Sequence, residues 1–116
     1  MIRGLLAFLF LPGLALAHAH LLTARPAAGS RVAQAPPSLE LSYSEAVEPG
    51  LTKVAVTDQT GAHFETGDPA ADPADARKIS VGLKPLPPGI YTVVWHAVAT
   101  DTHKTQGTFR FTVTGP

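Results

Sequence analysis

The chain of 116 residues lacks cysteine altogether. This absence excludes disulfide bonds, thiolate metal ligands and cysteine nucleophiles in one step. The chain also lacks an excess of charge of either sign, because nine Lys and Arg residues balance nine Asp and Glu residues. Nucleic-acid binding is therefore not expected, since it usually requires a basic surface stripe.

A hydrophobic run long enough to cross a membrane is also missing. The apolar stretch GLLAFLFL, residues 4–11, follows an arginine and is interrupted by a Pro-Gly pair. The run ends at Ala17, short of the ~20 residues that a spanning helix needs. Residues 15–17 form the small-x-small motif Ala-Leu-Ala, which is typical of a signal-peptide cleavage site. We therefore expect residues 1–17 to be a signal peptide cleaved after Ala17, and residues 18–116 to be one exported domain without a membrane span.

Signals for helices are scarce after the first seventeen residues, while eleven prolines and ten glycines punctuate the chain. Apolar and polar residues instead alternate with a period of two, as in strands that have one buried face. This alternation predicts strands near residues 39–44, 54–57, 79–83, 91–96 and 108–113. With a first strand near residues 20–24 and a returning strand at 62–66 after the turn TDQTG, about seven short strands are expected. About seven strands separated by turns indicate an all-β fold, a single antiparallel β-sandwich.

Two further stretches refine this fold prediction. LPPGIY, residues 86–91, places a tyrosine directly after a turn, which resembles the tyrosine corner of Greek-key sandwiches. GDPAADPADA, residues 67–76, is rich in Pro and Asp and predicts an exposed loop. Alternation places four aromatic residues on one buried face of the last two predicted strands. They are Tyr91, Trp95, Phe109 and Phe111.

The sequence LALAHAHLL, residues 14–22, contains two histidines directly after the expected cleavage site. Cleavage after Ala17 makes His18 the first residue of the mature chain. Its α-amine and its Nδ1 atom could then chelate a metal ion in a six-membered ring. A third nitrogen from another histidine would complete the T-shaped set called a histidine brace, and nitrogen with some oxygen in tetragonal geometry suits Cu(II).

Two local alternatives remain open at this end of the chain. A free N-terminus with a histidine in third position, His18-Ala19-His20, can bind Cu(II) or Ni(II) without any fold. That chelate uses the amine, two deprotonated backbone amides and the His20 ring. Cleavage after Ala19 is the second alternative, because Ala17-His18-Ala19 is also small-x-small. Either cut begins the mature chain with histidine.

The motif DTH offers a carboxylate and an imidazole two residues apart, Asp101 and His103. In an extended segment, this spacing places both side chains on one face. The two groups could reach one metal ion, or the carboxylate could orient the imidazole. Together with an N-terminal His18, they make a plausible set of four Cu(II) ligands.

Three blocks of the sequence resemble the CopC family of periplasmic copper-binding proteins. They are HAHLLTARPAAGS (residues 18–30), LELSYSEAVEPG (residues 39–50) and GIYTVVWHAVATDTHKTQGTFRFTV (residues 89–113). The resemblance covers essentially the whole expected mature chain. It implies a small Greek-key β-barrel or sandwich, similar in outline to cupredoxins and immunoglobulin domains. It also implies periplasmic localisation, a role in copper resistance or homeostasis, and an inner-membrane CopD-like protein as a partner.

The resemblance also implies a set of Cu(II) ligands. The matching positions in this chain are His18, Asp101, His103 and, in the YSE segment, Glu45. A Leu in fourth and a Pro in ninth position are typical of the family, and Leu21 and Pro26 fit only if the mature chain starts at His18. Some members also carry a Met-rich Cu(I) loop, whereas the only methionine here is the first residue. Cu(I) prefers soft thioether ligands, so we expect a protein that binds Cu(II) alone.

The three remaining histidines receive lesser roles. We expect His20 to be peripheral to the copper site, His63 to lie on the surface, and His96 to be structural or to support the ligands. The sequence thus predicts a Cu(II) carrier or buffer without catalytic turnover. Two other hypotheses are a copper-dependent oxidase of the lytic monooxygenase type, which shares the brace, and a metal-free immunoglobulin-like interaction module.

Overall fold

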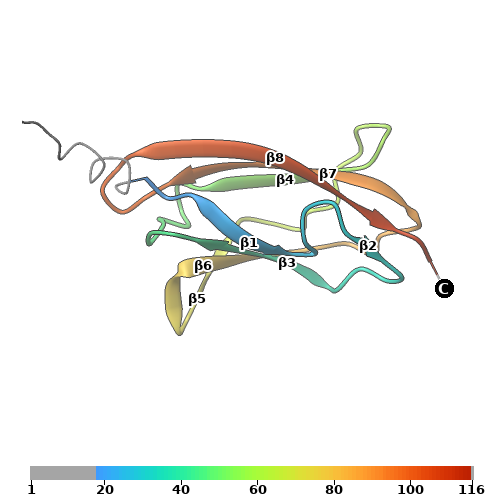
Figure 1. Ribbon diagram of the computed structural model, residues 1–116, viewed down its shortest axis with the longest axis horizontal. Coiled ribbons are helices and arrows are strands. Elements are labelled where there is room, and N and C mark those ends of the chain that lie inside the picture. Colours follow the sequence, from blue (N-terminus) through green and yellow to red (C-terminus); the bar gives the residue numbers. More distant parts are fainter. Residues whose placement is uncertain (1–17, 116) are drawn as a thin grey trace, which may run out of the picture.

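A computed structural model describes residues 18–115 of the chain, so the expected signal peptide, residues 1–17, lies outside the described residues. The described part contains eight strands in two four-stranded sheets that face each other (Figure 1). In chain order the strands are β1 (Leu21–Arg25), β2 (Arg31–Val32), β3 (Ser38–Tyr43), β4 (Lys53–Thr57), β5 (Ala70–Asp72), β6 (Asp75–Gly82), β7 (Gly89–Val98) and β8 (Lys104–Val113). The prediction of an all-β sandwich is confirmed.

The order of strands is β1-β3-β6-β5 in one sheet and β2-β8-β7-β4 in the other. The chain therefore crosses between the sheets after β1, β2, β3, β4 and β6, as in Greek-key sandwiches. The pairs are antiparallel except β2 with β8, which is parallel. The long hairpin of β7 and β8 is the most extensive pairing, running from Gly89↔Val113 to Val98↔Lys104.

Two sequence predictions for the middle of the chain are wrong. Residues 62–66 form isolated bridges, Thr57↔His63 and Glu65↔Leu83, instead of a continuous strand. Residues 67–76 are not only a loop, because they contain β5 and the start of β6. β5 lies at the edge of its sheet and its alanines are exposed. An edge strand without a buried face has no alternating pattern, which explains why the sequence did not indicate it.

The core lies between the sheets and is built by the alternating residues. Leu39, Leu41 and Tyr43 of β3 are buried, and so are Tyr91 and Trp95 of β7. The predicted core position of Phe111 is also confirmed, while Phe109 is partly buried and packs against the core. The tyrosine corner is confirmed as well, because the Tyr91 hydroxyl donates a hydrogen bond to the Pro87 carbonyl.

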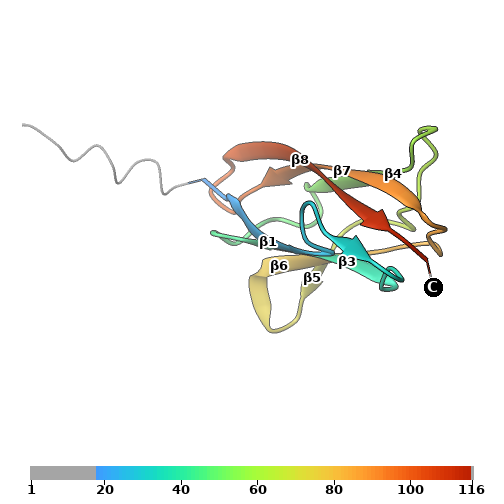
Figure 2. The ribbon, with the colours of Figure 1, turned by 45° about the vertical axis from the view of Figure 1, so that its right-hand side comes forward.

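Three segments meet at one end of the sandwich. The chain enters β1 beside the turn that joins β7 to β8, and both views show these two segments side by side (Figures 1 and 2). The connection after β3 joins them, because Thr100 donates its N–H to the Ala46 carbonyl at 3.1 Å and Val47 forms a bridge with Ala99. This end of the sandwich carries the residues for which the sequence predicted a metal site.

Residues 18–115 contain no helix with the length and hydropathy needed to cross a membrane.

Candidate metal centre

Hydrogen bonds from Ser44, which follows β3 of one sheet, and from Thr105 in β8 of the other sheet hold residues 18–20 in place. On one side, the Ser44 hydroxyl accepts the His20 N–H at 2.8 Å and donates to the His18 carbonyl at 3.1 Å. The Ser44 N–H also donates to the His20 carbonyl at 2.8 Å. On the other side, the Thr105 hydroxyl of β8 donates to the Ala19 carbonyl at 2.7 Å. These contacts determine where the His18 ring can lie.

The motif DTH forms the tight turn between β7 and β8. The turn is closed by backbone hydrogen bonds from Ala99 N–H to the His103 carbonyl at 2.9 Å and from Thr102 N–H to the Ala99 carbonyl at 2.8 Å. Thr102 adopts a positive φ of 76°. The expectation of an extended segment is therefore wrong. Asp101 and His103 meet because the turn folds them together, not because a strand places them on one face.

Asp101 holds His103 through both carboxylate oxygens. Oδ1 accepts the His103 backbone N–H at 3.1 Å, and Oδ2 lies 3.0 Å from Nδ1 of the His103 ring. An ionised carboxylate can only accept hydrogen bonds, so Nδ1 must carry the hydrogen. In a neutral ring this leaves the lone pair on Nε2, which is the atom available to a metal ion. This geometry favours the second possibility for Asp101, a carboxylate that orients the imidazole.

The His18 ring completes the cluster. It stacks on the His103 ring with a centroid separation of 4.9 Å and an interplanar angle of 26°, although the two residues are far apart in sequence. The centroid of the His20 ring lies 6.2 Å from that of the His18 ring, so three imidazoles gather at this end of the sandwich. The side chains of His103 and Asp101 are 54% and 46% exposed. The cluster is therefore open to solvent.

The electrostatics of the cluster favour a cation. Hydrogen bonds from the ring and the backbone N–H of His103 lower the pKa of Asp101. Asp101 is thus ionised at neutral pH and places a negative charge beside two imidazoles. Imidazole nitrogens with a carboxylate in reach are the donor types that Cu(II) accepts.

The side chains alone do not form a preformed metal site. Within the described residues, no group of three or more His, Asp or Glu side chains is arranged to hold a metal ion. The predicted set differs from such a group in one respect, because its third nitrogen is an α-amine. His18 gains that backbone group only by cleavage after Ala17. The donor types of His18, His103 and Asp101 suit a copper ion, and the three side chains lie close together.

Glu45 stands apart from the other predicted ligands. Its neighbours Ser44 and Ala46 bind the residue 18–20 segment and Thr100, so its backbone lies close to the cluster. The Glu45 side chain is exposed, and it makes no hydrogen bond or ion pair within residues 18–115. A role for Glu45 as a ligand stays a prediction.

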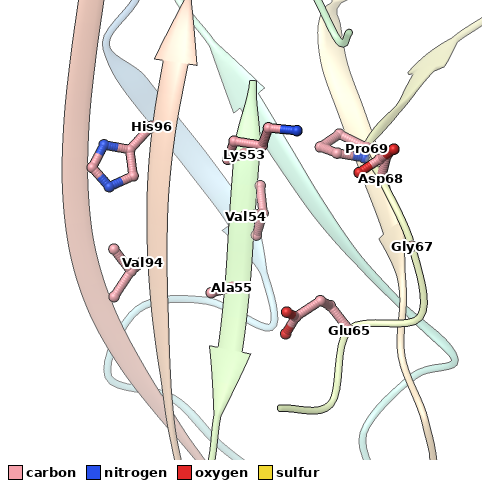
Figure 3. A pocket seen from close by; sticks show the side chains of 9 residues that line it. All are labelled: Lys53, Val54, Ala55, Glu65, Gly67, Asp68, Pro69, Val94 and His96. Atoms are coloured by element: carbon pink, nitrogen blue, oxygen red, sulfur yellow. The ribbon is translucent and has the colours of Figure 1, made fainter. Parts of the chain in front are cut away.

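The other two histidines lie away from the cluster. His63 is 61% exposed at its side chain and pairs through Nδ1 with Glu65 at 2.8 Å. His96 is exposed on β7 and lines a shallow pocket beside β4 (Figure 3). In that pocket Lys53 extends toward Asp68, while Glu65 lies further along β4, so the polar groups do not converge on one point. Sequence reasoning missed Ser44 and Thr105, since hydroxyls near strand ends carry no signal of long-range partners.

The sandwich and the imidazole-carboxylate cluster at its end define a small β-sandwich domain with a candidate metal centre. A family model described as the CopC domain matches residues 21–114. Protein YobA of Escherichia coli K12 is 39% identical over 98 residues, which cover 84% of this chain and 79% of YobA. The chain belongs to the CopC family, and the resemblance stated from the sequence is confirmed.

Solved structures agree with this assignment. The crystal structure of CopC from Methylosinus trichosporium OB3b superposes with a TM-score of 0.79 at 26% identity, covering 84% of this chain and 95% of that one. The crystal structure of PcoC, a methionine-rich copper resistance protein from Escherichia coli, gives a TM-score of 0.68 at 32% identity. It covers 84% of this chain and 99% of PcoC.

Proposed function

We propose that this protein is a periplasmic Cu(II)-binding protein that carries or buffers copper in copper resistance or homeostasis. The observation that carries the proposal is the stacking of His18 on the Asp101-held His103 ring at the exposed end of the sandwich. Membership of the CopC family and the similarity to a copper resistance protein support copper as the cargo. Because the only methionine is Met1, the mature chain offers no thioether, and Cu(II) is the preferred state.

Each residue has a distinct role in binding the cargo. His18 contributes its α-amine and Nδ1, and His103 contributes Nε2. Asp101 keeps the His103 ring in the required tautomer and orientation, and its charge offsets part of the charge of the ion. Ser44 and Thr105 position His18 by holding the backbone around it. The α-amine must lose its proton to bind, so affinity should fall as the pH is lowered below about 7.7–8.0, the ordinary pKa range of α-amines.

The test is a Cu(II) titration of the processed protein against a competing chelator. Beside it we would titrate a version with one extra residue before His18, and the variants His103→Ala and His63→Ala. We expect the extension and His103→Ala to weaken binding greatly, because each removes a nitrogen ligand. His63→Ala is the matched control, since His63 also pairs with a carboxylate two residues away but has no role here. Equal binding by all four proteins would overturn the proposal.

Asp101 is tested separately from the ligands. Asp101→Asn keeps the shape of the side chain but removes its charge and can present an N–H to Nδ1 instead of an acceptor. Loss of such a supporting partner typically lowers metal affinity by about 10–100-fold. An affinity unchanged from the wild type would contradict the positioning role of Asp101, while leaving the two nitrogen ligands in place.

The exposure of the cluster supports direct transfer of copper to another protein. With His103 and Asp101 about half exposed, an acceptor can approach the ion without unfolding of the domain. We propose an inner-membrane CopD-like protein as that acceptor. Transfer of copper from the loaded protein to membranes that contain such a protein, but not to membranes without it, would support this step.

Two results would favour the other hypotheses. Reductant-driven oxidation of a polysaccharide by the copper-loaded protein would make it an oxidase. Recovery of correctly processed protein without copper from a copper-supplemented periplasm would favour a metal-free interaction module.

A further inference from the structure

The mature N-terminus offers two ways to bind a metal ion, and they exclude each other. In the brace, the metal binds the α-amine and ring of His18 with the ring of His103. In the amide chelate of His18-Ala19-His20, it binds the α-amine, the backbone nitrogens of Ala19 and His20, and the His20 ring. Formation of the amide chelate makes four metal–nitrogen bonds; at the two backbone nitrogens a metal–nitrogen bond replaces the N–H bond, and both amide protons are released to the buffer.

In the folded domain, the two backbone nitrogens that the amide chelate needs are hydrogen-bonded or buried. The His20 N–H donates to the Ser44 hydroxyl at 2.8 Å, so a metal at that nitrogen must displace the hydroxyl. Ala19 is fully buried, with an exposure of 0%, and its carbonyl accepts the Thr105 hydroxyl at 2.7 Å. Neither amide nitrogen is therefore accessible to an ion while the segment stays in place.

Ser44 makes three hydrogen bonds to this segment. Its hydroxyl accepts from His20 and donates to the His18 carbonyl at 3.1 Å, and its own N–H donates to the His20 carbonyl at 2.8 Å. The two hydroxyl contacts depend on the side chain, whereas the third depends only on the backbone. Removal of the hydroxyl should thus free the His20 N–H without deleting the backbone pairing.

We propose that Ser44 determines which chelate forms at the mature N-terminus: its hydroxyl holds residues 18–20 against the sandwich and thereby suppresses the amide chelate in favour of the brace. This inference rests on the proposed cleavage after Ala17. It assigns Ser44 a positioning and selectivity role, with square-planar Ni(II) and Cu(II) complexes as the excluded species. Figures 1 and 2 show that the start of β1 lies beside the β7–β8 turn, which carries His103.

The experiment uses Ni(II) as the probe, because nickel in the amide chelate is square planar and diamagnetic and has a distinct visible absorption. Processed wild type, Ser44→Ala, Ser44→Thr and Ser42→Ala are titrated with Ni(II) while folded, and again in urea. Ser42 is the matched control, since it is half-buried in β3 two residues before Ser44. Mass spectrometry establishes that each chain begins at His18.

We expect the amide spectrum from all four proteins in urea, and from Ser44→Ala alone when folded. Each neutral hydrogen bond shifts such an equilibrium by about three- to tenfold, so the apparent Ni(II) affinity of Ser44→Ala for this chelate should rise by a factor of roughly 10–100. Ser44→Thr should behave as the wild type because it keeps the hydroxyl. If Ser44→Ala does not fold, as judged by Trp95 fluorescence, Thr105→Val replaces it, and we expect a gain of about three- to tenfold, because Thr105 makes one hydrogen bond to the segment.

The amide spectrum in folded wild type, at the nickel concentration that produces it in Ser44→Ala, would overturn the inference. Its absence from every folded variant would overturn it too. A separate result would overturn the proposed function, namely a Cu(II) affinity of His103→Ala equal to that of the wild type. In that case the nickel result still decides the role of Ser44.

Discussion

Two histidine-carboxylate pairs with the same spacing show how much location matters for a single residue. His103 lies 3.0 Å from Asp101, and His63 lies 2.8 Å from Glu65, each through Nδ1 and each two residues apart. Only His103 has a second imidazole stacked on it. The Glu65 carboxylate instead accepts the Val56 N–H at 2.8 Å and thereby secures the edge of β4. One pair thus belongs to the candidate metal centre and the other to the fold.

Glu65 gives the fold a dependence on pH. Burial by itself would raise the pKa of Glu65, but hydrogen bonds from the Val56 N–H and His63 outweigh it, so the pKa lies below its ordinary value of 4.5. A lowered pKa in the folded state means that its stabilisation is present above pH 4.5 and is lost as pH falls through the folded value. Glu65→Gln keeps an oxygen for Val56 but cannot ionise.

We therefore expect the free energy of unfolding of the wild type to fall toward that of Glu65→Gln as the solution is acidified below about pH 4.5. Urea unfolding at a series of pH values measures both proteins. A difference between them that stays constant from neutral to acidic pH would contradict the assignment.

At the scale of elements, the β7–β8 hairpin is adapted to one aromatic side chain. Trp95 pairs with Gly107 across the hairpin and packs edge-on against Tyr43, with ring centroids 5.3 Å apart. A Cβ atom at Gly107 would lie 2.6 Å from Cζ2 of the indole and 2.9 Å from its Nε1. Glycine is thus required here by the close approach of the Trp95 ring. The same hairpin carries the DTH turn at its end, so its packing also positions the candidate metal centre.

Gly107→Ala should consequently destabilise the domain. Overpacking of this kind typically costs about 1–3 kcal/mol, because the indole must shift within a packed core. Trp95 is the only tryptophan, so its fluorescence reports unfolding in urea directly. The exposed neighbour Gln106 provides the control variant Gln106→Ala. Equal stability of the two variants would show that the indole moves without cost.

At the scale of the whole molecule, the first residues of the expected mature chain connect the two sheets. Ser44 follows β3 of one sheet, and Thr105 belongs to β8 of the other. Residues 18–20 lie between them and bind both. A metal ion shared by His18 and His103 would add a further connection at this end, in a domain that has no disulfide bond.

Copper should accordingly stabilise the folded domain. Free Cu(II) at one hundred times its Kd contributes about 2.7 kcal/mol, which for a domain of this size raises Tm on the order of 10 °C. Thermal unfolding with and without Cu(II) measures the shift for the processed protein. His63→Ala should retain the shift and His103→Ala should lose it. A full shift in His103→Ala would place the bound copper elsewhere.

The sequence by itself determined the features that depend on local patterns. Alternation with a period of two reports which face of a strand is buried, and it identified β3, β4, β6, β7 and β8. The turn before Tyr91 identified the tyrosine corner. The motifs at His18 and at Asp101 and His103 indicated the candidate ligands, because residue type and spacing define their chemistry before any folding.

Only the tertiary structure decided what depends on strand pairing. β2 and β5 lie at sheet edges, β2 has only two residues and the alanines of β5 are exposed, so no alternation marks either strand. Thr105 reaches Ala19 across 86 residues of sequence, and Ser44 reaches His18 across 26. Such contacts follow from the way segments distant in sequence pack together in the two sheets, and the pattern of neighbouring residues does not specify those partners. The stacking of His18 on His103 is of the same kind: the motifs supply the groups, and the packing of the sheets brings them together.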